Sequence, residues 1–140
     1  MGREYPVHPL IGVSVVVRRR SCILLVKRAA EPGRGLWVVP GGLVKLGEKL
    51  CDAALREVKE ETGLKVKIHG IFDVVDYISR DSEKKVQYHY VIVDFLGHPI
   101  SGKLRASSEN LDTRWVNIKD LKNYEMTKPL RNAFKRKGLI

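Results

Sequence analysis

The stretch GLVKLGEKLCDAALREVKEETGL, residues 42–64, decides the fold and the chemistry of this chain. Its apolar residues recur three and four positions apart and a glycine follows them, so we predict a helix over residues 48–62. Glu57, Glu60 and Glu61 then fall within an arc of about 100° on one helix face. Acidic side chains in the last turns interact unfavourably with the helix dipole, and each should destabilise the helix by about 0.3–1 kcal/mol. A hard divalent cation, held by oxygen ligands, would offset their repulsion.

The same helix carries an apolar stripe beside its acidic face. The stripe consists of Leu50, Cys51, Ala54, Leu55, Val58 and Thr62. We therefore expect the helix to lie against a sheet, with its acids at the lip of a cleft. Arg56 precedes Glu60 by four residues, so the two can pair and fix the orientation of that carboxylate. An ordinary solvated helix end would explain a lone pair of glutamates, but it does not explain the whole set.

The spacing of these residues resembles the signature of the Nudix hydrolase family. That signature is Gly, five residues, Glu, seven residues, Arg-Glu, an apolar residue, any residue, Glu-Glu, any residue, Gly and an apolar residue. The chain matches it without insertion or substitution at Gly42, Glu48, Arg56, Glu57, Val58, Glu60, Glu61, Gly63 and Leu64. Fixed spacing over so many positions is far more specific than a glycine-loop motif. Residues 35–42 (GLWVVPGG) and 114–116 (RWV) also resemble the family, so the resemblance covers nearly the whole chain.

The resemblance implies both a fold and a reaction. The fold would be of the α/β class, an α/β/α sandwich around a mixed β-sheet. The reaction would be hydrolysis of a nucleoside diphosphate linked to another group, by attack of water at phosphorus with Mg²⁺ or Mn²⁺. Such an ion clamps phosphate oxygens and lowers the pKa of a bound water. The metal ligands that the match implies are Glu57, Glu60 and Glu61, with Glu48 and a backbone carbonyl of Gly41 or Gly42 as further contributors.

Two further roles follow from the resemblance. Arg56 would orient the metal ligands from behind rather than contact the substrate. The residue that activates water would be Glu61 in our first interpretation and Glu109, in the loop before Trp115, in the second. Glu109 is equally well explained as an ordinary exposed loop residue.

Arginine and glycine supply the expected substrate contacts. Arg28 closes a predicted strand where related enzymes place a phosphate-contacting arginine, and a guanidinium suits two phosphate oxygens at once. Its alternative is a solvated charge at a strand end. Arg34 is a second candidate on the same grounds. Gly41 has no Cβ, so the backbone there can approach a ligand closely.

Length and composition indicate one domain, and we assign residues 1–140 to it. With 44% apolar and 30% charged residues, the chain is neither disordered nor fibrous. No apolar run is long enough to cross a bilayer, and the first residues, MGREYP, lack the apolar core of a secretory signal. Two cysteines are too few for a disulfide framework, so we expect Cys22 and Cys51 to be buried thiols in a reducing cytoplasm.

The net charge of +10 is consistent with phosphate-bearing ligands, and it is equally well explained as a solvated surface, since Lys and Arg are spread along the chain. Basic residues gather at 18–20 and 128–137, which we interpret as a solvated hairpin tip and an amphipathic helix with Leu130, Ala133 and Phe134 inward. Neither segment has the interleaved aromatic residues of a single-strand nucleic-acid platform, which argues against a nucleic-acid partner. Family members often form dimers, and a homodimer stays open for this chain.

The remaining pattern alternates strands and helices. Strands are expected at residues 8–18, 22–27, 37–39, 66–78, 86–96 and 113–116, and helices at 118–122 and 128–137. Residues 86–96 are apolar on both faces, which is typical of a central strand. Residues 40–42 (Pro-Gly-Gly) should turn tightly, and 97–111 should form a loop.

Aromatic residues and histidines are less informative. The aromatic candidates for holding a base are Trp37, Tyr88, Tyr90 and Trp115. The tyrosines share one strand face and the tryptophans lie near the expected cleft walls, but core packing is the better interpretation for each. His69 and His98 show no metal-ligand spacing, and we assign them no role.

The favoured substrate is a nucleoside diphosphate sugar, ADP-ribose first, cleaved to AMP and ribose 5-phosphate. This rests on the resemblance of residues 31–37 and 88–90 to Nudix proteins with that activity. One departure counts against it, because a well-known ADP-ribose subgroup has a proline where this chain has Ser79-Arg80-Asp81. The alternatives are a nucleoside triphosphate pyrophosphatase that removes damaged nucleotides, an RNA 5′-end pyrophosphohydrolase and a non-catalytic nucleotide-sensing domain.

Overall fold

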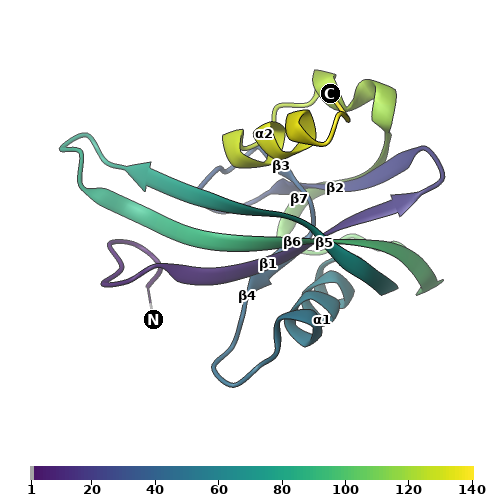
Figure 1. Ribbon diagram of the computed structural model, residues 1–140, viewed down its shortest axis with the longest axis horizontal. Helices are drawn as coiled ribbons and strands as arrows, with labels where there is room; N and C mark the ends of the chain where they lie inside the picture. Colours follow the sequence, from purple (N-terminus) through teal and green to yellow (C-terminus); the bar gives the residue numbers. More distant parts are fainter. Residues whose placement is uncertain (1) are drawn as a thin grey trace.

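The computed structural model describes residues 2–140 (Figure 1). The strands are β1 (Leu10–Arg19), β2 (Cys22–Arg28), β3 (Trp37–Val38), β4 (Gly41–Leu43), β5 (Leu64–Arg80), β6 (Val86–Gly102) and β7 (Asn110–Asn117). The helices are α1 (Leu50–Thr62), the 3-10 helix η1 (Ile118–Asn123) and α2 (Lys128–Arg136). Each predicted helix and strand therefore exists, with bounds that differ at several ends.

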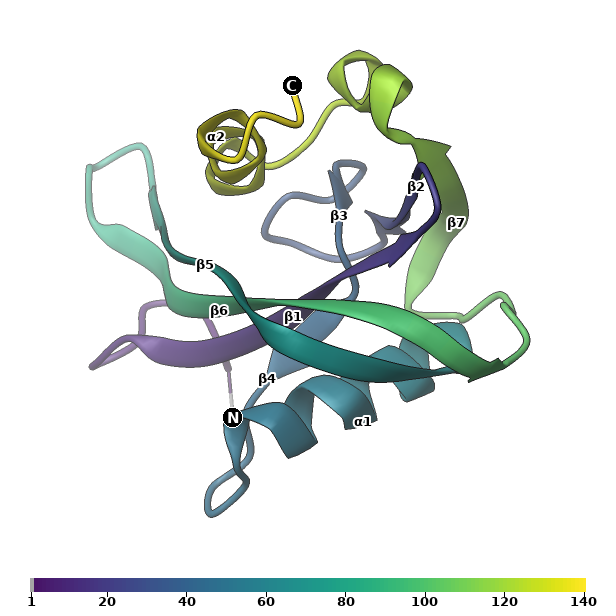
Figure 2. The same cartoon turned by 45° about the vertical axis from the view of Figure 1, so that its right-hand side comes forward.

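The strands form a mixed sheet in the order β3-β2-β1-β6-β5, with β4 paired to β1 and β7 paired to β2. β1 and β6 run parallel over residues 10–17, whereas the end of β1 turns away to pair with β2 through Arg18 and Arg19. α1 covers one side of this arrangement and α2 the other (Figure 2). The predicted α/β/α sandwich with a mixed β-sheet is confirmed, and β6 is central because it lies between β1 and β5.

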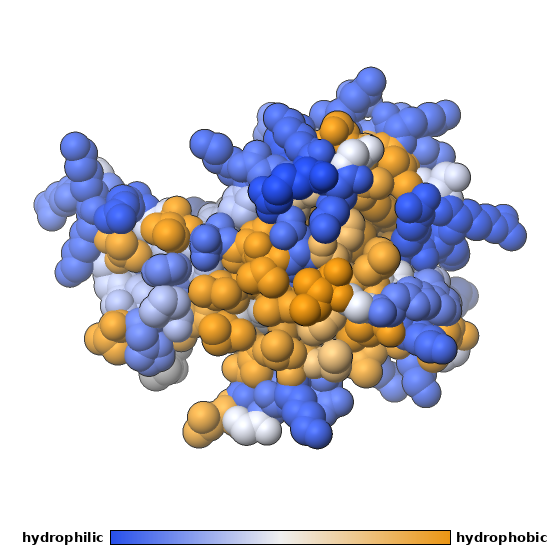
Figure 3. Space-filling model, in the orientation of Figure 1, coloured by the Kyte–Doolittle hydropathy of each residue, from blue (hydrophilic) through white to orange (hydrophobic). Residues whose placement is uncertain are grey.

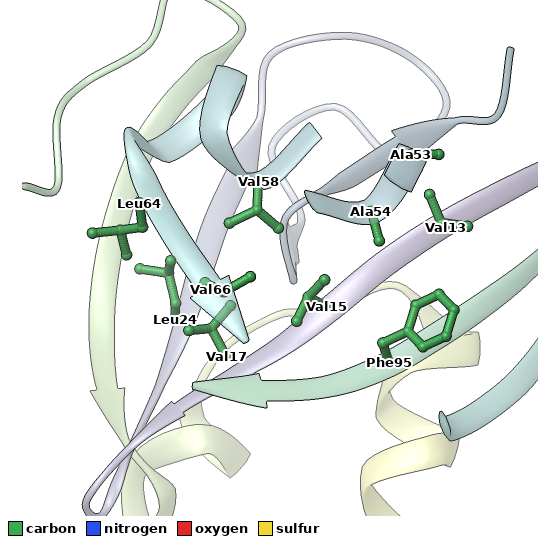
Figure 4. Close-up of a cluster of buried hydrophobic side chains, with 10 residues drawn as sticks. All are labelled: Val13, Val15, Val17, Leu24, Ala53, Ala54, Val58, Leu64, Val66 and Phe95. Atoms are coloured by element: carbon green, nitrogen blue, oxygen red, sulfur yellow. The ribbon is translucent and has the colours of Figure 1, made fainter. Parts of the chain in front are cut away.

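Two hydrophobic clusters hold the helices on the strands. The cluster beneath α1 contains Val13, Val15, Val17, Leu24, Ala53, Ala54, Val58, Leu64, Val66 and Phe95 (Figure 4). Val16 points the other way, into the cluster that also contains Leu130 and Phe134 of α2. This alternation follows from the two-residue period of a strand that is buried on both faces. The predicted inward face of the C-terminal helix is confirmed, since Leu130, Ala133 and Phe134 are all buried.

The rotation of α1 about its axis differs from the prediction. Its buried residues are Ala53, Ala54, Val58, Glu61 and Thr62, whereas Leu50, Cys51 and Leu55 of the expected stripe are exposed. The sheet approaches the helix through its two alanines because small side chains permit close packing. Glu61 lies seven residues after Ala54 and so turns inward with that face. The helix ends as predicted, with Gly63 at φ 78°, but it begins at Leu50 rather than at Glu48.

The longest hairpin exceeds its predicted length at both ends. β5 and β6 extend to residues 64–80 and 86–102, so the expected loop over 97–111 shrinks to residues 103–109. The predicted second strand ended at residue 96. Instead, Pro99 lies opposite Val66 next to a shift in the pairing register, where a residue without an N–H is tolerated.

One face of the molecule carries a broad apolar region. Figure 3 shows hydrophobic side chains in the middle of the face seen in Figure 1, where β5 and α1 lie. β5 is the last strand in the sheet order, and its Ile71, Val74 and Ile78 are exposed. The expected burial of both cysteines is wrong: Cys22 is half-buried and Cys51 exposed, and both are free thiols. Within residues 2–140, none of the helices has the length and hydropathy needed to cross a membrane.

Candidate functional site

A cavity of about 140 Å³ lies among residues of β1, β2, β4, β5, β6 and α2. It also reaches Glu61 of α1 and Asn110, the first residue of β7. Four residues that the sequence singled out line it, namely Gly41, Gly42, Arg28 and Glu61. The fold thus brings an arginine from the end of β2, two glycines from β4 and a glutamate from α1 to the same cavity.

The glycines of β4 lie tightly against their neighbours. A Cβ atom at Gly42 would lie 2.4 Å from Cδ of Glu57, and one at Gly41 would lie 2.2 Å from the carbonyl oxygen of Val13. A side chain fits at neither position, so the Glu57 carboxylate rests directly on the backbone of β4. The prediction of a tight turn over residues 40–42 is wrong, because Gly41–Leu43 form a strand paired with β1. The glycines there allow neighbouring groups to approach the backbone of β4 closely.

Arg56 lies behind the acidic side chains and binds three of them. Its Nε and Nη2 donate to the two carboxylate oxygens of Glu48 at 2.8 and 2.9 Å. Its Nη1 donates to Oε1 of Glu57 at 2.7 Å and to Oε2 of Glu60 at 3.3 Å. Nη2 also donates to the carbonyl of Leu43 on β4. The predicted pairing with Glu60 is confirmed, and the Arg56 hydrogen bonds hold the pKa of Glu48 down to about 2.

Glu57 and Glu61, which we call the inner acids, lie in surroundings that disfavour the ionised form of a carboxyl group. Glu61 is only 9% exposed, and burial, followed by the charge of Glu57, raises its pKa to about 8. Burial also raises the pKa of Glu57, although the hydrogen bond from Arg56 opposes the shift. Oε2 of Glu61 is buried and has no hydrogen-bond partner. A cation bound here would favour the ionised form of both carboxyl groups.

The donor set fits a hard divalent cation, since it consists of carboxylate and backbone oxygens. The unpartnered Oε2 of Glu61 and the side-chain-free backbone at Gly42 leave room for one. Within residues 2–140, no three His, Cys, Asp or Glu side chains stand close enough to hold a metal by themselves. The side chain of Glu60 is half exposed and turned toward Arg56. Glu57 and Glu61, together with a carbonyl from β4, therefore fit a cation best.

Glu109 lies close enough to act on this site. It is exposed in the loop before β7, and its charge contributes to the raised pKa of both Glu57 and Glu61. Its own backbone N–H donates to the Ser107 hydroxyl. Glu109 is thus near enough for its charge to act on Glu57 and Glu61, but it does not line the cavity.

The two arginines proposed for substrate contacts have different surroundings. Arg28 is half-buried at the cavity, its Nε donates to the carbonyl of Pro32 at 2.6 Å, and its charge lowers the pKa of Glu61. Arg34 is exposed, does not line the cavity, and donates to the carbonyl of Ala29. Only Arg28 is brought to the site.

Sequence reasoning missed several polar residues that line the cavity. Asn110 lies near Glu61 and lowers its pKa as a hydrogen-bond partner would, yet Asn110 Nδ2 and Glu61 Oε2 each lack a partner within hydrogen-bonding distance. The two side chains are therefore close to each other without forming a hydrogen bond. Asp94 is 3% exposed, and burial raises its pKa to about 6 against the opposing hydrogen bond from Ser14. The one available signal was an acid within the apolar run of residues 91–95.

The aromatic candidates divide between core and cavity. Trp37 belongs to the cluster beneath α2 and Trp115 packs against the cluster beneath α1, so neither forms a wall of the cavity as expected. Tyr90 does line the cavity, and its hydroxyl is buried without a partner. The rings of His69 and His98, which looked unrelated, stack with centroids 4.6 Å apart on the exposed part of β5 and β6.

Comparisons with known proteins agree with this geometry. The family model described as the NUDIX domain matches residues 8–137. The ADP-ribose pyrophosphatase of Methanocaldococcus jannaschii is 32% identical over 114 residues, which are 81% of this chain but only 65% of that protein's length. The nucleoside triphosphatase NudI of Escherichia coli is 28% identical over 91% of this chain and 96% of its own. The crystal structure of a MutT NUDIX hydrolase from Burkholderia pseudomallei superimposes with a TM-score of 0.81 at 30% identity, covering 91% of this chain and 97% of that one.

Proposed function

The chain belongs to the Nudix family, and on that premise we propose that it hydrolyses a nucleoside diphosphate linked to another group, with Mg²⁺ or Mn²⁺. The observation that carries this proposal is the placement of Glu57 and Glu61. Glu57 lies on the bare backbone of Gly42, and Glu61 is buried at the cavity with one oxygen unpartnered. Burying two carboxyl groups in this way destabilises a protein unless they bind a cation.

The roles of the residues follow from their contacts. A bound Mg²⁺ or Mn²⁺ would clamp phosphate oxygens and lower the pKa of the attacking water. Glu57 and Glu61 are its proposed ligands, with Glu60, Glu48 and a carbonyl of Gly41 or Gly42 as further contributors. Arg56 orients three of them, Glu48, Glu57 and Glu60, because its guanidinium donates hydrogen bonds to each.

The proton of the attacking water needs an acceptor near the inner acids. Glu61 is our first candidate, since its Oε2 is buried at the cavity and has no hydrogen-bond partner within residues 2–140. Glu109 is the second, because it is exposed in the loop before β7 and its charge acts on Glu57 and Glu61. Arg28 would bind a phosphate of the substrate at the cavity.

ADP-ribose is the proposed first substrate, with AMP and ribose 5-phosphate as products. The similarity to the ADP-ribose pyrophosphatase of Methanocaldococcus jannaschii supports this choice. Removal of pyrophosphate from nucleoside triphosphates is the second candidate, and it is favoured by the relative from Escherichia coli, which this chain matches over nearly its whole length. A single domain, a cytoplasmic location and a homodimer stay predictions.

A substrate panel tests the proposal. The protein would be incubated with ADP-ribose, other nucleoside diphosphate sugars and nucleoside triphosphates, with Mg²⁺ or with EDTA, and the products identified by chromatography. We expect AMP and ribose 5-phosphate from ADP-ribose, no product with EDTA, and loss of activity in Glu57→Gln while circular dichroism shows an intact fold. Glu83→Gln, in the exposed turn between β5 and β6, is the matched control. Turnover that survives both EDTA and Glu57→Gln would contradict the proposal.

A further inference from the structure

The unsatisfied polar atoms of the interior gather in one place. Within residues 2–140, the buried side-chain atoms without a hydrogen-bond partner are Oε2 of Glu61, the hydroxyl of Tyr90, Oδ2 of Asp94 and Nδ2 of Asn110. All four residues line the same cavity. Buried polar groups are nearly always satisfied in folded proteins, because each orphan is costly. Their collection around one space indicates that a bound molecule supplies the missing partners.

The orphans belong to two parts of the cavity with different chemistry. Glu61 and Asn110 belong to the acidic part already described. Asp94 lies on β6 directly beside Ser14 of β1, and the Ser14 hydroxyl donates to its Oδ1. This bond fixes the carboxylate and leaves Oδ2 as a buried acceptor at the cavity wall.

A phosphate is a poor partner for Asp94 itself, although Arg3 and Arg28 also line the cavity. A buried carboxylate repels an anion, and neither Arg28 nor another cation bonds to Asp94. The neighbouring walls are apolar, formed by Val13, Val39 and Ile92 among others. The cavity of about 140 Å³ is smaller than the roughly 300–1,000 Å³ usual for whole small-molecule ligands, so its part beside Asp94 suits one flat portion of a substrate rather than the whole molecule. A nucleobase has that shape and carries N–H donors on its edge.

We propose that Asp94, held by Ser14, is a specificity-determining residue that accepts a hydrogen bond from the exocyclic amine of the substrate's nucleobase. The inference rests on the proposed function, since it assigns the base of the same substrate. A carboxylate accepts from an amine on adenine, guanine or cytosine. It is repelled by the carbonyl oxygens that flank the ring N–H of uracil. The preference is therefore for amino-bearing bases.

Burial raises the pKa of Asp94 only to about 6, because the hydrogen bond from Ser14 opposes the shift. The group is thus mostly ionised at pH 7.5, as an acceptor must be. Tyr90, on the same face of β6 four residues earlier, carries a free hydroxyl that can donate to a ring nitrogen.

Product binding tests the inference without requiring catalysis. AMP and IMP differ at the position of the exocyclic amine, where IMP carries an oxygen. Calorimetry at pH 7.5 with Mg²⁺ would give their dissociation constants, together with those of CMP, UMP and ribose 5-phosphate. We expect the wild type to bind AMP about tenfold or more tightly than IMP, since a site built for a donor rejects an analogue that lacks it. CMP should likewise bind more tightly than UMP.

Variants then assign the preference to Asp94. Asp94→Asn keeps the volume but replaces one acceptor by a donor, and we expect AMP and IMP to bind about equally. Asp76→Asn, the same change at an exposed position of β5 outside this cavity, should keep the wild-type ratio. Ser14→Ala serves if Asp94→Asn does not fold, and it should reduce the ratio because the carboxylate loses its tether.

The outcomes separate this inference from the proposed function. A wild type that does not distinguish AMP from IMP, or an Asp94→Asn variant that still does, overturns it, and a water then satisfies Oδ2. An equal loss of ribose 5-phosphate binding in Asp94→Asn also overturns it, because the contact would be to the sugar. If the amine preference depends on Asp94 while no substrate is hydrolysed, the inference holds and the proposed activity fails.

Discussion

Replacing Glu61 by glutamine should stabilise the metal-free protein at alkaline pH. Burial and the charge of Glu57 raise the folded-state pKa of Glu61 from 4.5 to about 8. Between these values the unfolded chain has already released the proton that the folded protein keeps, so the free energy of unfolding falls as pH rises. At 1.36 kcal/mol per pKa unit, the loss between pH 5 and pH 8 is about 3 kcal/mol, as an order of magnitude. Glutamine keeps the shape of the side chain and does not titrate.

Urea denaturation at pH 5 and pH 8, with EDTA present, measures this difference. The wild type should lose about 3 kcal/mol of stability relative to Glu61→Gln over that interval. Mg²⁺ added at pH 8 should restore the wild type and leave the variant unchanged, because a cation favours the ionised carboxylate. Glu83→Gln, at an exposed turn, should follow the wild type. Parallel pH profiles for the wild type and Glu61→Gln would refute the reasoning.

Three further changes test the supports of the site. Gly42→Ala should lower stability by about 1–3 kcal/mol in thermal unfolding and reduce hydrolysis, because the new Cβ meets the Glu57 carboxylate; Gly70→Ala, where nothing lies within 4 Å, should do neither. Arg105→Met removes hydrogen bonds to the last carbonyls of α1 and should cost about 1 kcal/mol in urea denaturation; an unchanged midpoint would show that these bonds add nothing. Glu109→Gln should lower kcat by about a hundredfold if that residue is the base; near-normal kcat would leave Glu61 in that role.

Local spacing predicted the parts of the site that lie within one segment. The helix end at Gly63 and the pairing of Arg56 with Glu60 depend only on residues close in sequence, and both are confirmed. The rotation of α1 depends on which face the sheet can approach. Two alanines permitted a closer contact than Leu50 and Leu55, and the apolar pattern alone did not distinguish these choices.

Long-range contacts carried the features that sequence reasoning missed. Ser14 and Asp94 are 80 positions apart and meet only because β1 and β6 run parallel. Asn110, the first residue of β7, lines the cavity together with residues of β1, β2 and β6 that are distant from it in the sequence. Contacts between residues so far apart produce no local pattern from which the sequence could predict them.

The central claim is that the inner glutamates bind a divalent cation for phosphate chemistry. A titration of Mn²⁺ followed by electron paramagnetic resonance measures this binding directly, for the wild type and for a variant that combines Glu57→Gln with Glu61→Gln. The account predicts that the wild type removes free Mn²⁺ from solution at a site for which Mg²⁺ competes, and that the double variant does not. Equal binding by both proteins, or no binding by the wild type, would contradict it.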